Sequence, residues 1–245
     1  MSGDRRTAVV TGGSSGIGLE VGRKLVERGY DVVLTARTAA TLEAAAADVG
    51  ARCVAADSAD PDAFARVVAE AGSVDLLVHA AGVMDGTFVR KESLATFESV
   101  LRTNLTSAFV AANAALPVMP AGGRMIFLSS SSSHAPQPGL SAYSASKAGL
   151  NAFALALAAE VQRDGVSVHV VTTGPVATKM LDDVRFPMRT LGVDEVAEAV
   201  VWLDTLPGNV VLPELEVSSV DTGPFAPAPF VPEAARQLGR TEIPE

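Results

Sequence analysis

Short, nearly continuous apolar runs alternate with longer Ala-rich segments over the first two thirds of the chain. The apolar runs predict strands at about residues 7–11, 31–35, 52–56, 76–79, 124–129 and 167–172. The segments around them predict helices at about residues 17–28, 39–49, 61–71, 94–116, 142–163 and 193–205. Strands that are apolar on both faces belong to a parallel sheet covered by helices on both sides. The pattern therefore predicts an α/β protein, with a doubly wound parallel sheet in a three-layer sandwich.

The chain of 245 residues is long enough for one full hydrophobic core and short for two, so we expect a single domain over residues 1–220. The end of the chain differs in composition, because five of the 14 prolines fall in residues 221–245. This Pro-rich tail is predicted to be extended or partly disordered, or to clasp a neighbouring subunit.

Charge and composition exclude several classes of partner. The chain has 19 Lys and Arg against 28 Asp and Glu, and its net charge of −9 opposes binding to nucleic acid or anionic lipid. No apolar run approaches the roughly 18 residues of a membrane-spanning helix. The single Cys53 rules out an internal disulfide and fits a reducing compartment. We expect a cytoplasmic protein without nucleic-acid or membrane partners, which acts on a small molecule.

A glycine-rich turn follows the first predicted strand and leads into the first predicted helix. It reads Thr11-Gly12-Gly13-Ser14-Ser15-Gly16-Ile17-Gly18. Glycines let a diphosphate approach the backbone amides, and the helix N-terminus offers free N–H groups and a partial positive charge. The spacing is G-x-x-x-G-x-G and not the common G-x-G-x-x-G. Dinucleotide binding and a purely structural turn both remain open on this pattern alone.

The end of the second predicted strand indicates the choice of cofactor. An acidic residue at this point would bind the ribose hydroxyls of NAD, whereas an arginine would pair with the 2′-phosphate of NADP. The strand ends Leu34-Thr35-Ala36-Arg37-Thr38, with a guanidinium and no carboxylate. This favours NADP. The alternative is that Arg37 is an ordinary solvated surface residue.

Three polar residues stand out against an apolar background: Ser130 after the fifth predicted strand, then Tyr143 and Lys147. A helical spacing of four residues puts the phenol and the ammonium on one face. An ammonium near a phenol lowers the pKa of the phenol toward working pH, as a general acid requires. Taken alone, a tyrosine and a lysine at this spacing are more often a surface ion–dipole contact than a catalytic pair.

In combination these motifs resemble the short-chain dehydrogenase/reductase family over about residues 5–220. The family's glycine turn is matched by residues 11–18, and its Tyr-x-x-x-Lys by Tyr143 and Lys147, with Ser130 thirteen positions before the tyrosine. Its helix asparagine is matched by Asn104, and its adenine-contacting aspartate by Asp57. The resemblance implies a single-domain Rossmann fold and an NADP-dependent oxidoreductase.

The resemblance also implies roles for single residues. Tyr143 donates the proton, Ser130 hydrogen-bonds the substrate oxygen, Lys147 lowers the pKa of the tyrosine and holds the nicotinamide ribose, and Asn104 holds a water in a proton relay. The residues expected to bind NADP(H) are Gly12, Ser14, Ser15, Gly16, Ile17, Gly18, Arg37, Thr38, Asp57, Ser58, Ala81, Gly82, Tyr143, Lys147, Gly174, Val176 and Thr178.

Two positions depart from the family pattern. The family's Asn-Asn-Ala-Gly reads His79-Ala80-Ala81-Gly82, and we expect His79 to be structural. Its Pro-Gly turn around the nicotinamide carboxamide reads Thr173-Gly174, with threonine in place of the proline. His134 and His169 show no metal-ligand spacing, so no metal is expected.

The family also implies a lid over the substrate, at about residues 180–191, and a homodimer or homotetramer. Arg185 and Arg189 in that lid could meet an anionic substrate or simply be solvated. The expected reaction moves a hydride between nicotinamide and a carbonyl or secondary alcohol. Alternatives are reduction of an imine or enone on the same scaffold, and an NADP-sensing regulator without turnover.

Overall fold

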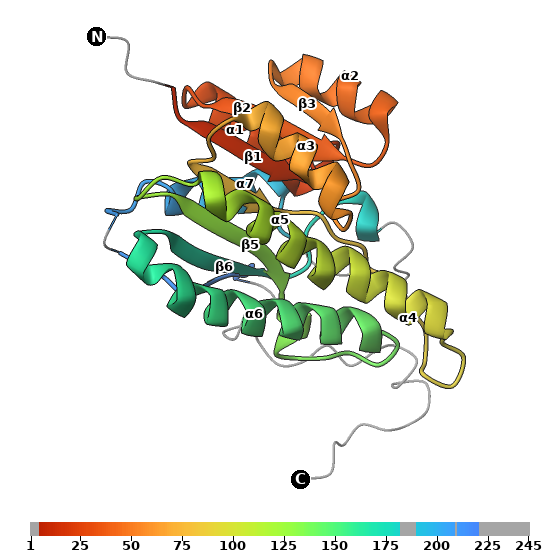
Figure 1. Ribbon diagram of the computed structural model, residues 1–245. Helices are drawn as coiled ribbons and strands as arrows, with labels where there is room; N and C mark the ends of the chain where they lie inside the picture. Colours follow the sequence, from red (N-terminus) through yellow and green to blue (C-terminus); the bar gives the residue numbers. More distant parts are fainter. Residues whose placement is uncertain (1–4, 182–189, 209, 221–245) are drawn as a thin grey trace.

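A parallel sheet of seven strands forms the middle layer of the computed structural model, which describes residues 5–181, 190–208 and 210–220 (Figure 1). The strand order is β3-β2-β1-β4-β5-β6-β7, and every pair is parallel. The strands are β1 (Thr7–Thr11), β2 (Asp31–Ala36), β3 (Arg52–Ala55), β4 (Leu76–His79), β5 (Arg124–Ser130), β6 (Ser167–Thr173) and β7 (Glu214–Val217).

Helices cover both faces of this sheet, as the apolar strands predict. One face packs against α3 (Pro61–Ala71), α5 (Ser107–Ala115) and α6 (Ser141–Val161), which lie on the near side in Figure 1, with α4 (Leu94–Leu101) continuing the line of α5. The other face packs against α1 (Gly16–Glu27), α2 (Ala39–Val49) and α7 (Val193–Leu203). Neighbouring strand residues alternate between the two cores: Val9 belongs to the first, while Ala8 and Val10 belong to the second. The predicted three-layer α/β fold is confirmed.

The strand order reverses between β1 and β4, and this reversal locates the site. In open α/β sheets a crevice forms outside the carboxyl ends of the strands at such a point. The register sets Thr11 beside both Thr35 and His79 at this edge of the sheet. The glycine turn after β1 and the Ala80–Gly82 segment after β4 therefore lie next to each other.

The structure corrects one predicted helix. The helix expected over residues 94–116 is interrupted by a π-helical segment, Arg102–Thr106, between α4 and α5. A π segment forms i→i+5 hydrogen bonds, and such segments are rare and short inside α-helices. The sequence pattern therefore could not reveal it. Asn104 lies fully buried inside this segment.

The seventh strand was not predicted. β7 has four residues, Glu-Leu-Glu-Val, and pairs only with β6 at the edge of the sheet. Its charged and apolar residues alternate over too short a span to stand out from a loop. The six predicted strands each agree with the structure to within one residue.

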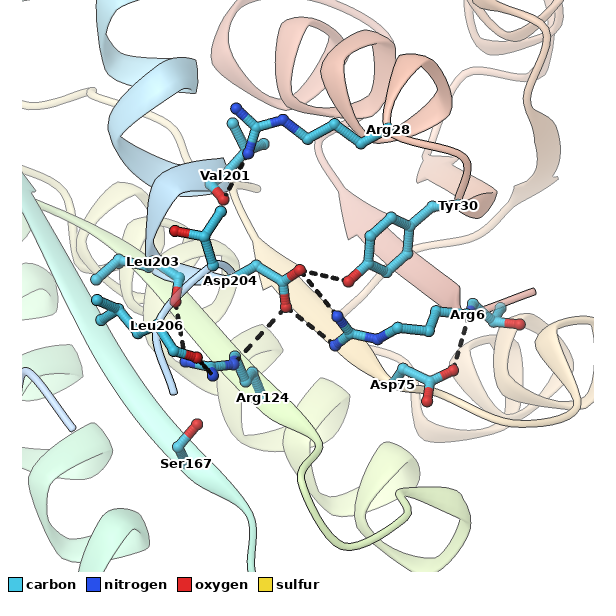
Figure 2. A network of polar contacts seen from close by, with 12 residues as sticks. Arg6, Arg28, Tyr30, Asp75, Arg124, Ser167, Val201, Leu203, Asp204 and Leu206 are labelled. Carbon is cyan, nitrogen blue, oxygen red and sulfur yellow. Dashed lines mark hydrogen bonds and ion pairs between the residues drawn. The ribbon is translucent and has the colours of Figure 1, made fainter. Parts of the chain in front are cut away.

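A polar cluster at the amino edge of the sheet ties the end of α7 to β1 and β5 (Figure 2). Asp204 accepts two hydrogen bonds from Arg6, at 3.0 Å each, and one from the hydroxyl of Tyr30. The buried Arg124 lies 3.7 Å from the same carboxylate and donates to the backbone oxygens of Leu203 and Leu206. Because bidentate, charge-assisted contacts are among the stronger polar interactions, this cluster fixes the edge opposite the crevice.

Two predicted segments fall largely or wholly outside the described residues. The Pro-rich tail, residues 221–245, is one of them, and most of the lid, residues 182–189 with Arg185 and Arg189, is the other. The division into a domain and a tail stays a prediction. Within the described part of the chain, no helix is both long and apolar enough to cross a membrane.

Candidate active site

A cavity of about 1340 Å³ opens at the carboxyl ends of the central strands. All seventeen residues expected to bind NADP(H) line it, and so does Ser130. Asn104 is the one predicted site residue that does not line it. The fold thus gathers into one space residues that lie up to 166 positions apart in the chain, from Gly12 to Thr178.

The glycine turn forms one end of the cavity, and its geometry requires glycine. Gly12 has a φ of +67°, and a Cβ on Gly18 would lie 2.5 Å from the Gly12 carbonyl oxygen. Helix α1 begins within this turn, at Gly16. Its N-terminus has no side-chain cap, because Ser15 makes no capping hydrogen bond. An uncapped helix N-terminus that faces a cavity can bind an anion through its N–H groups.

Where β2 and β3 end at the cavity, two arginines lie around the carboxylate of Asp57. Asp57 accepts hydrogen bonds from the Ala59 amide at 2.9 Å and from Arg102 at 2.8 Å. Burial opposes ionisation of Asp57, but these bonds and the charge of Arg37 outweigh it and lower the pKa of the carboxyl. Arg37 is exposed, and no hydrogen bond or ion pair engages it within the described chain. Its guanidinium is free to meet an anion.

Sequence reasoning missed Arg102. It occupies the first position of the π segment, where it reaches both Asp57 and the backbone oxygen of Ala59, at 2.9 Å. The two partners of this ion pair are 45 residues apart, and each was unremarkable in its own segment. Nothing in the sequence signalled the contact.

Tyr143 points into the opposite part of the cavity from α6 and is 7% exposed. Burial raises the pKa of the phenol above its ordinary value, and the hydrogen bond with Ser130 lowers it in part. Burial is the larger effect, so the phenol stays protonated at neutral pH. A protonated hydroxyl held by a neighbouring serine can donate a hydrogen to an oxygen placed beside both.

Lys147 lies beside Tyr143 and is held there by a backbone oxygen. Its ammonium donates to the Leu128 backbone oxygen at 2.8 Å and lies 5.9 Å from the centroid of the Tyr143 ring. Burial lowers the pKa of Lys147 to about 8. In the structure as described, the group that lowers the pKa of the phenol is Ser130. One helical turn brings the two side chains near each other without a hydrogen bond between them, and the role of Lys147 in lowering the pKa of the phenol stays a prediction.

The side chain of Asn104 is engaged by protein groups. Its amide nitrogen donates to the Val83 oxygen and to Ser146 Oγ, both at 2.9 Å, and its oxygen accepts from the Val83 amide at 2.8 Å. Both amide hydrogens are therefore used within the protein. Asn104 holds the segment after β4 against α6, and the expected water contact is not made by its amide hydrogens.

His79 is structural, as predicted. Ser107 Oγ donates to the Thr103 oxygen at 2.5 Å, so it accepts from Nε2 of His79 at 3.1 Å. Nδ1 then accepts from the Thr11 hydroxyl at 3.0 Å, and Thr11 Oγ1 in turn accepts from the amides of Ala80 and Ala81. This tautomer is assigned from the hydrogen-bond network. Burial, with the charge of Lys147, lowers the pKa of His79 to about 3, so the ring is neutral.

The turn after β6 closes the cavity from the other side. The Gly174 amide donates to the Val217 oxygen at 3.1 Å, and Val176 pairs with Leu191 where the chain returns from the lid segment. The methyl group of Thr178 would lie 3.4 Å from a Cβ on Gly16, so this turn sits against the glycine turn. The described residues contain no group of three or more potential metal ligands.

Comparison with known proteins agrees with this geometry. The family model described as short chain dehydrogenase matches residues 6–188. Acetoacetyl-CoA reductase of Cupriavidus necator is 34% identical over 225 residues, which cover 82% of this chain and 91% of the reductase. The cyclic-di-GMP-binding biofilm dispersal mediator protein of Escherichia coli is 32% identical, over 81% of this chain and 89% of that protein.

Solved structures show the same likeness. A short chain dehydrogenase from Burkholderia cenocepacia, determined in complex with NADP, superposes with a TM-score of 0.79 at 29% sequence identity. The match covers 87% of this chain and 95% of the other. Sequence and structure comparisons therefore agree on one family.

Proposed function

Because the chain belongs to the short-chain dehydrogenase family, we propose that it is an NADP(H)-dependent oxidoreductase that acts on a carbonyl or secondary alcohol, with Tyr143 as general acid and base. The observation that carries this proposal is that Tyr143 and Ser130 line the same cavity as the glycine turn. A phenol that can donate a proton, a second hydroxyl and an anion-binding turn in one cavity are what carbonyl reduction with a dinucleotide needs.

The cavity fits NADP(H) on three counts. The first turn of α1 is uncapped and can receive a diphosphate. Gly12 and Gly18 are so closely packed that neither position has room for a side chain, which leaves the backbone of the turn open to the cofactor. Arg37 is unpaired at the end of β2, where a 2′-phosphate would meet it. The Burkholderia structure, which is a complex with NADP, supports the same choice of cofactor.

The bound cofactor supplies or accepts the hydride. The protein's own residues handle the oxygen of the substrate. Ser130 and Tyr143 donate hydrogen bonds to that oxygen, and Tyr143 transfers its proton as negative charge develops there. Lys147 keeps a buried positive charge nearby, held by Leu128, which further stabilises an oxyanion.

The test is a panel of carbonyl compounds followed by NADPH absorbance, with Tyr143→Phe beside the wild type. Loss of the proton donor should lower kcat by about 100-fold or more. NADPH affinity, measured by fluorescence, should stay nearly the same because the ring remains in place. Tyr30→Phe is the matched control, since Tyr30 bonds Asp204 at the far edge of the sheet. Unchanged turnover in Tyr143→Phe would end the assignment.

The same panel separates two other functions. Turnover of imines or enones, but not of ketones, would make the protein a reductase of those groups. Tight NADPH binding without any turnover would favour a regulator, a possibility that the similarity to the Escherichia coli biofilm dispersal mediator keeps in view. The presence of both Tyr143 and Lys147 favours the enzyme.

We also propose that the protein forms a homodimer or homotetramer through α5 and α6. Phe109 on α5 and Leu155 on α6 are 54% and 51% exposed, on the layer that covers one face of the sheet. Exposed large apolar side chains are typical of a surface that a partner covers. Light scattering at micromolar concentration should give a multimer, and Leu155→Glu with Phe109→Glu should reduce it to a monomer. A monomeric wild type would refute the proposal.

A further inference from the structure

Glu214, on the edge strand β7, is the acceptor at the centre of a polar cluster behind the cavity. Its Oε1 accepts from Thr172 Oγ1 at 2.5 Å, from His134 Nε2 at 2.6 Å and from Asn151 Nδ2 at 3.5 Å. The three donors come from β6, from the turn after β5 and from α6. One carboxylate thus joins four elements that are far apart in the sequence.

The cluster leads directly to Ser130. Asn151 Nδ2 also donates to Ser133 Oγ at 3.2 Å, and Ser133 Oγ donates to the backbone oxygen of Ser130 at 2.7 Å. On its other side, Asn151 Oδ1 accepts from Ser129 Oγ at 2.5 Å. The residues before and after Ser130 are therefore both held by one amide, which Glu214 in turn helps to orient.

Two donors of the cluster, Asn151 and Thr172, are buried, whereas Glu214 itself is exposed. Asn151 is 8% exposed and Thr172 is 1% exposed, so neither can exchange a lost partner freely for water. Burial opposes ionisation of Glu214, but the hydrogen bonds from His134 and Thr172 lower the pKa of the carboxyl. An ionised acceptor forms shorter and stronger hydrogen bonds than a neutral one. The carboxylate is therefore well suited to fix the orientation of Asn151.

We propose that Glu214 is a positioning residue for the reaction: through Asn151 and Ser133 it fixes the backbone at Ser130, so that the Ser130 hydroxyl faces Tyr143. This inference rests on the proposed function of Ser130 and Tyr143. The competing explanation is that the cluster merely attaches β7 to the sheet. That explanation predicts a loss of stability without any effect on Tyr143.

The first test compares Glu214→Leu and Glu214→Gln with Glu216→Leu as the control. Glu216 lies on the same strand, but within the described residues its carboxylate accepts a hydrogen bond only from Ser218, at 3.0 Å. Glu214→Leu should lower kcat by about 5- to 10-fold without changing NADPH affinity. Glu214→Gln should lose less, because its amide oxygen still accepts. The control should keep wild-type kcat.

A pH profile separates positioning from stability. The contact with Ser130 lowers the pKa of Tyr143, so loosening it should move the alkaline limb of the kcat profile to higher pH in Glu214→Leu. Ser133→Ala cuts the connection without touching β7 and should have the same effect. The double variant should be no worse than either single one, because both remove one connection. Melting temperatures are recorded alongside for all variants.

A readout without turnover keeps this inference apart from the proposed function. The chain has only two tyrosines, so protein labelled with ζ-¹³C tyrosine gives two signals, which Tyr30→Phe assigns. The Tyr143 signal should shift in Glu214→Leu and Ser133→Ala and stay in place in Glu216→Leu. An unmoved signal and an unchanged pH profile in the first two variants would overturn the positioning role, whatever their melting temperatures. Turnover that survives Tyr143→Phe would overturn the proposed function instead.

Discussion

Replacing His79 with asparagine should remove an acid-sensitive part of the free energy of unfolding. The imidazole is 1% exposed, and burial with the charge of Lys147 lowers its pKa from 6.5 to about 3. The folded protein therefore keeps His79 neutral at pH values where the unfolded chain already binds a proton. Because the unfolded state binds more protons in this window, stability falls as the pH drops from about 6.5 toward 3.

The two pKa values set the size of the effect. An unfolded pKa of about 6.5 and a folded pKa of about 3 give a loss of about 2 kcal/mol between pH 7 and pH 5. The Asn variant has nothing to titrate at this position, so its stability lacks that contribution. All other ionisable groups are the same in both proteins. Subtracting one pH curve from the other isolates His79.

The assay is urea unfolding at pH 7, 6 and 5, followed by circular dichroism. The free energy of unfolding of the wild type, minus that of His79→Asn, should fall by about 2 kcal/mol from pH 7 to pH 5. Phe64→Leu is the matched control, because it disturbs the buried core without removing an ionisable group and should leave the difference from wild type nearly flat. A difference that is the same at all three pH values for His79→Asn would show that the ring is not held neutral.

Two other predictions concern the cofactor and the sheet. Arg37→Ala should weaken the binding of NADPH by about 1 to 3 kcal/mol and the binding of NADH far less. Arg102→Ala, which removes the partner of Asp57, should weaken the binding of both cofactors alike. Fluorescence titrations measure both affinities, and an equal loss for NADPH and NADH in Arg37→Ala would contradict the 2′-phosphate contact. Asp204→Ala should lower the free energy of unfolding by about 3 kcal/mol, because it leaves the buried Arg124 without its carboxylate. In urea unfolding, Glu198→Ala, which removes an exposed carboxylate of α7, should cost under about 1 kcal/mol, and an equally small loss in Asp204→Ala would refute the buried pair.

The strands and the glycine turn could be predicted because their causes are local. A strand buried on both faces must be apolar throughout, so residues 76–79 or 167–172 are visible in the sequence by themselves. Gly18 is required because any side chain would meet the Gly12 carbonyl only six residues earlier. The cavity-lining set followed from these local motifs once they were read together.

The missed features depend on partners that are distant in the chain. The π segment changes which carbonyl each amide meets but is short, so it left no mark on the pattern. β7 becomes a strand only because β6 offers it an edge. Glu214 was likewise not singled out, because its partner His134 lies 80 residues away in the chain. No local propensity encodes such a contact.

The balance of effects on Tyr143 bears on the direction of the reaction. Burial raises the pKa of the phenol and outweighs the opposing contact with Ser130, while Lys147 is held on Leu128. A phenol that is protonated at neutral pH is ready to donate to a developing alkoxide, but it must lose a proton before it can accept one from an alcohol. Under the proposed function, carbonyl reduction starts from this protonated phenol, whereas alcohol oxidation needs the phenolate. Ser130 is a group that lowers the pKa of this phenol, so contacts that fix Ser130 tune the proton donor. The Ser132 amide holds the Ser130 hydroxyl directly, at 3.2 Å, and the proposed path from Glu214 through Asn151 and Ser133 holds its backbone.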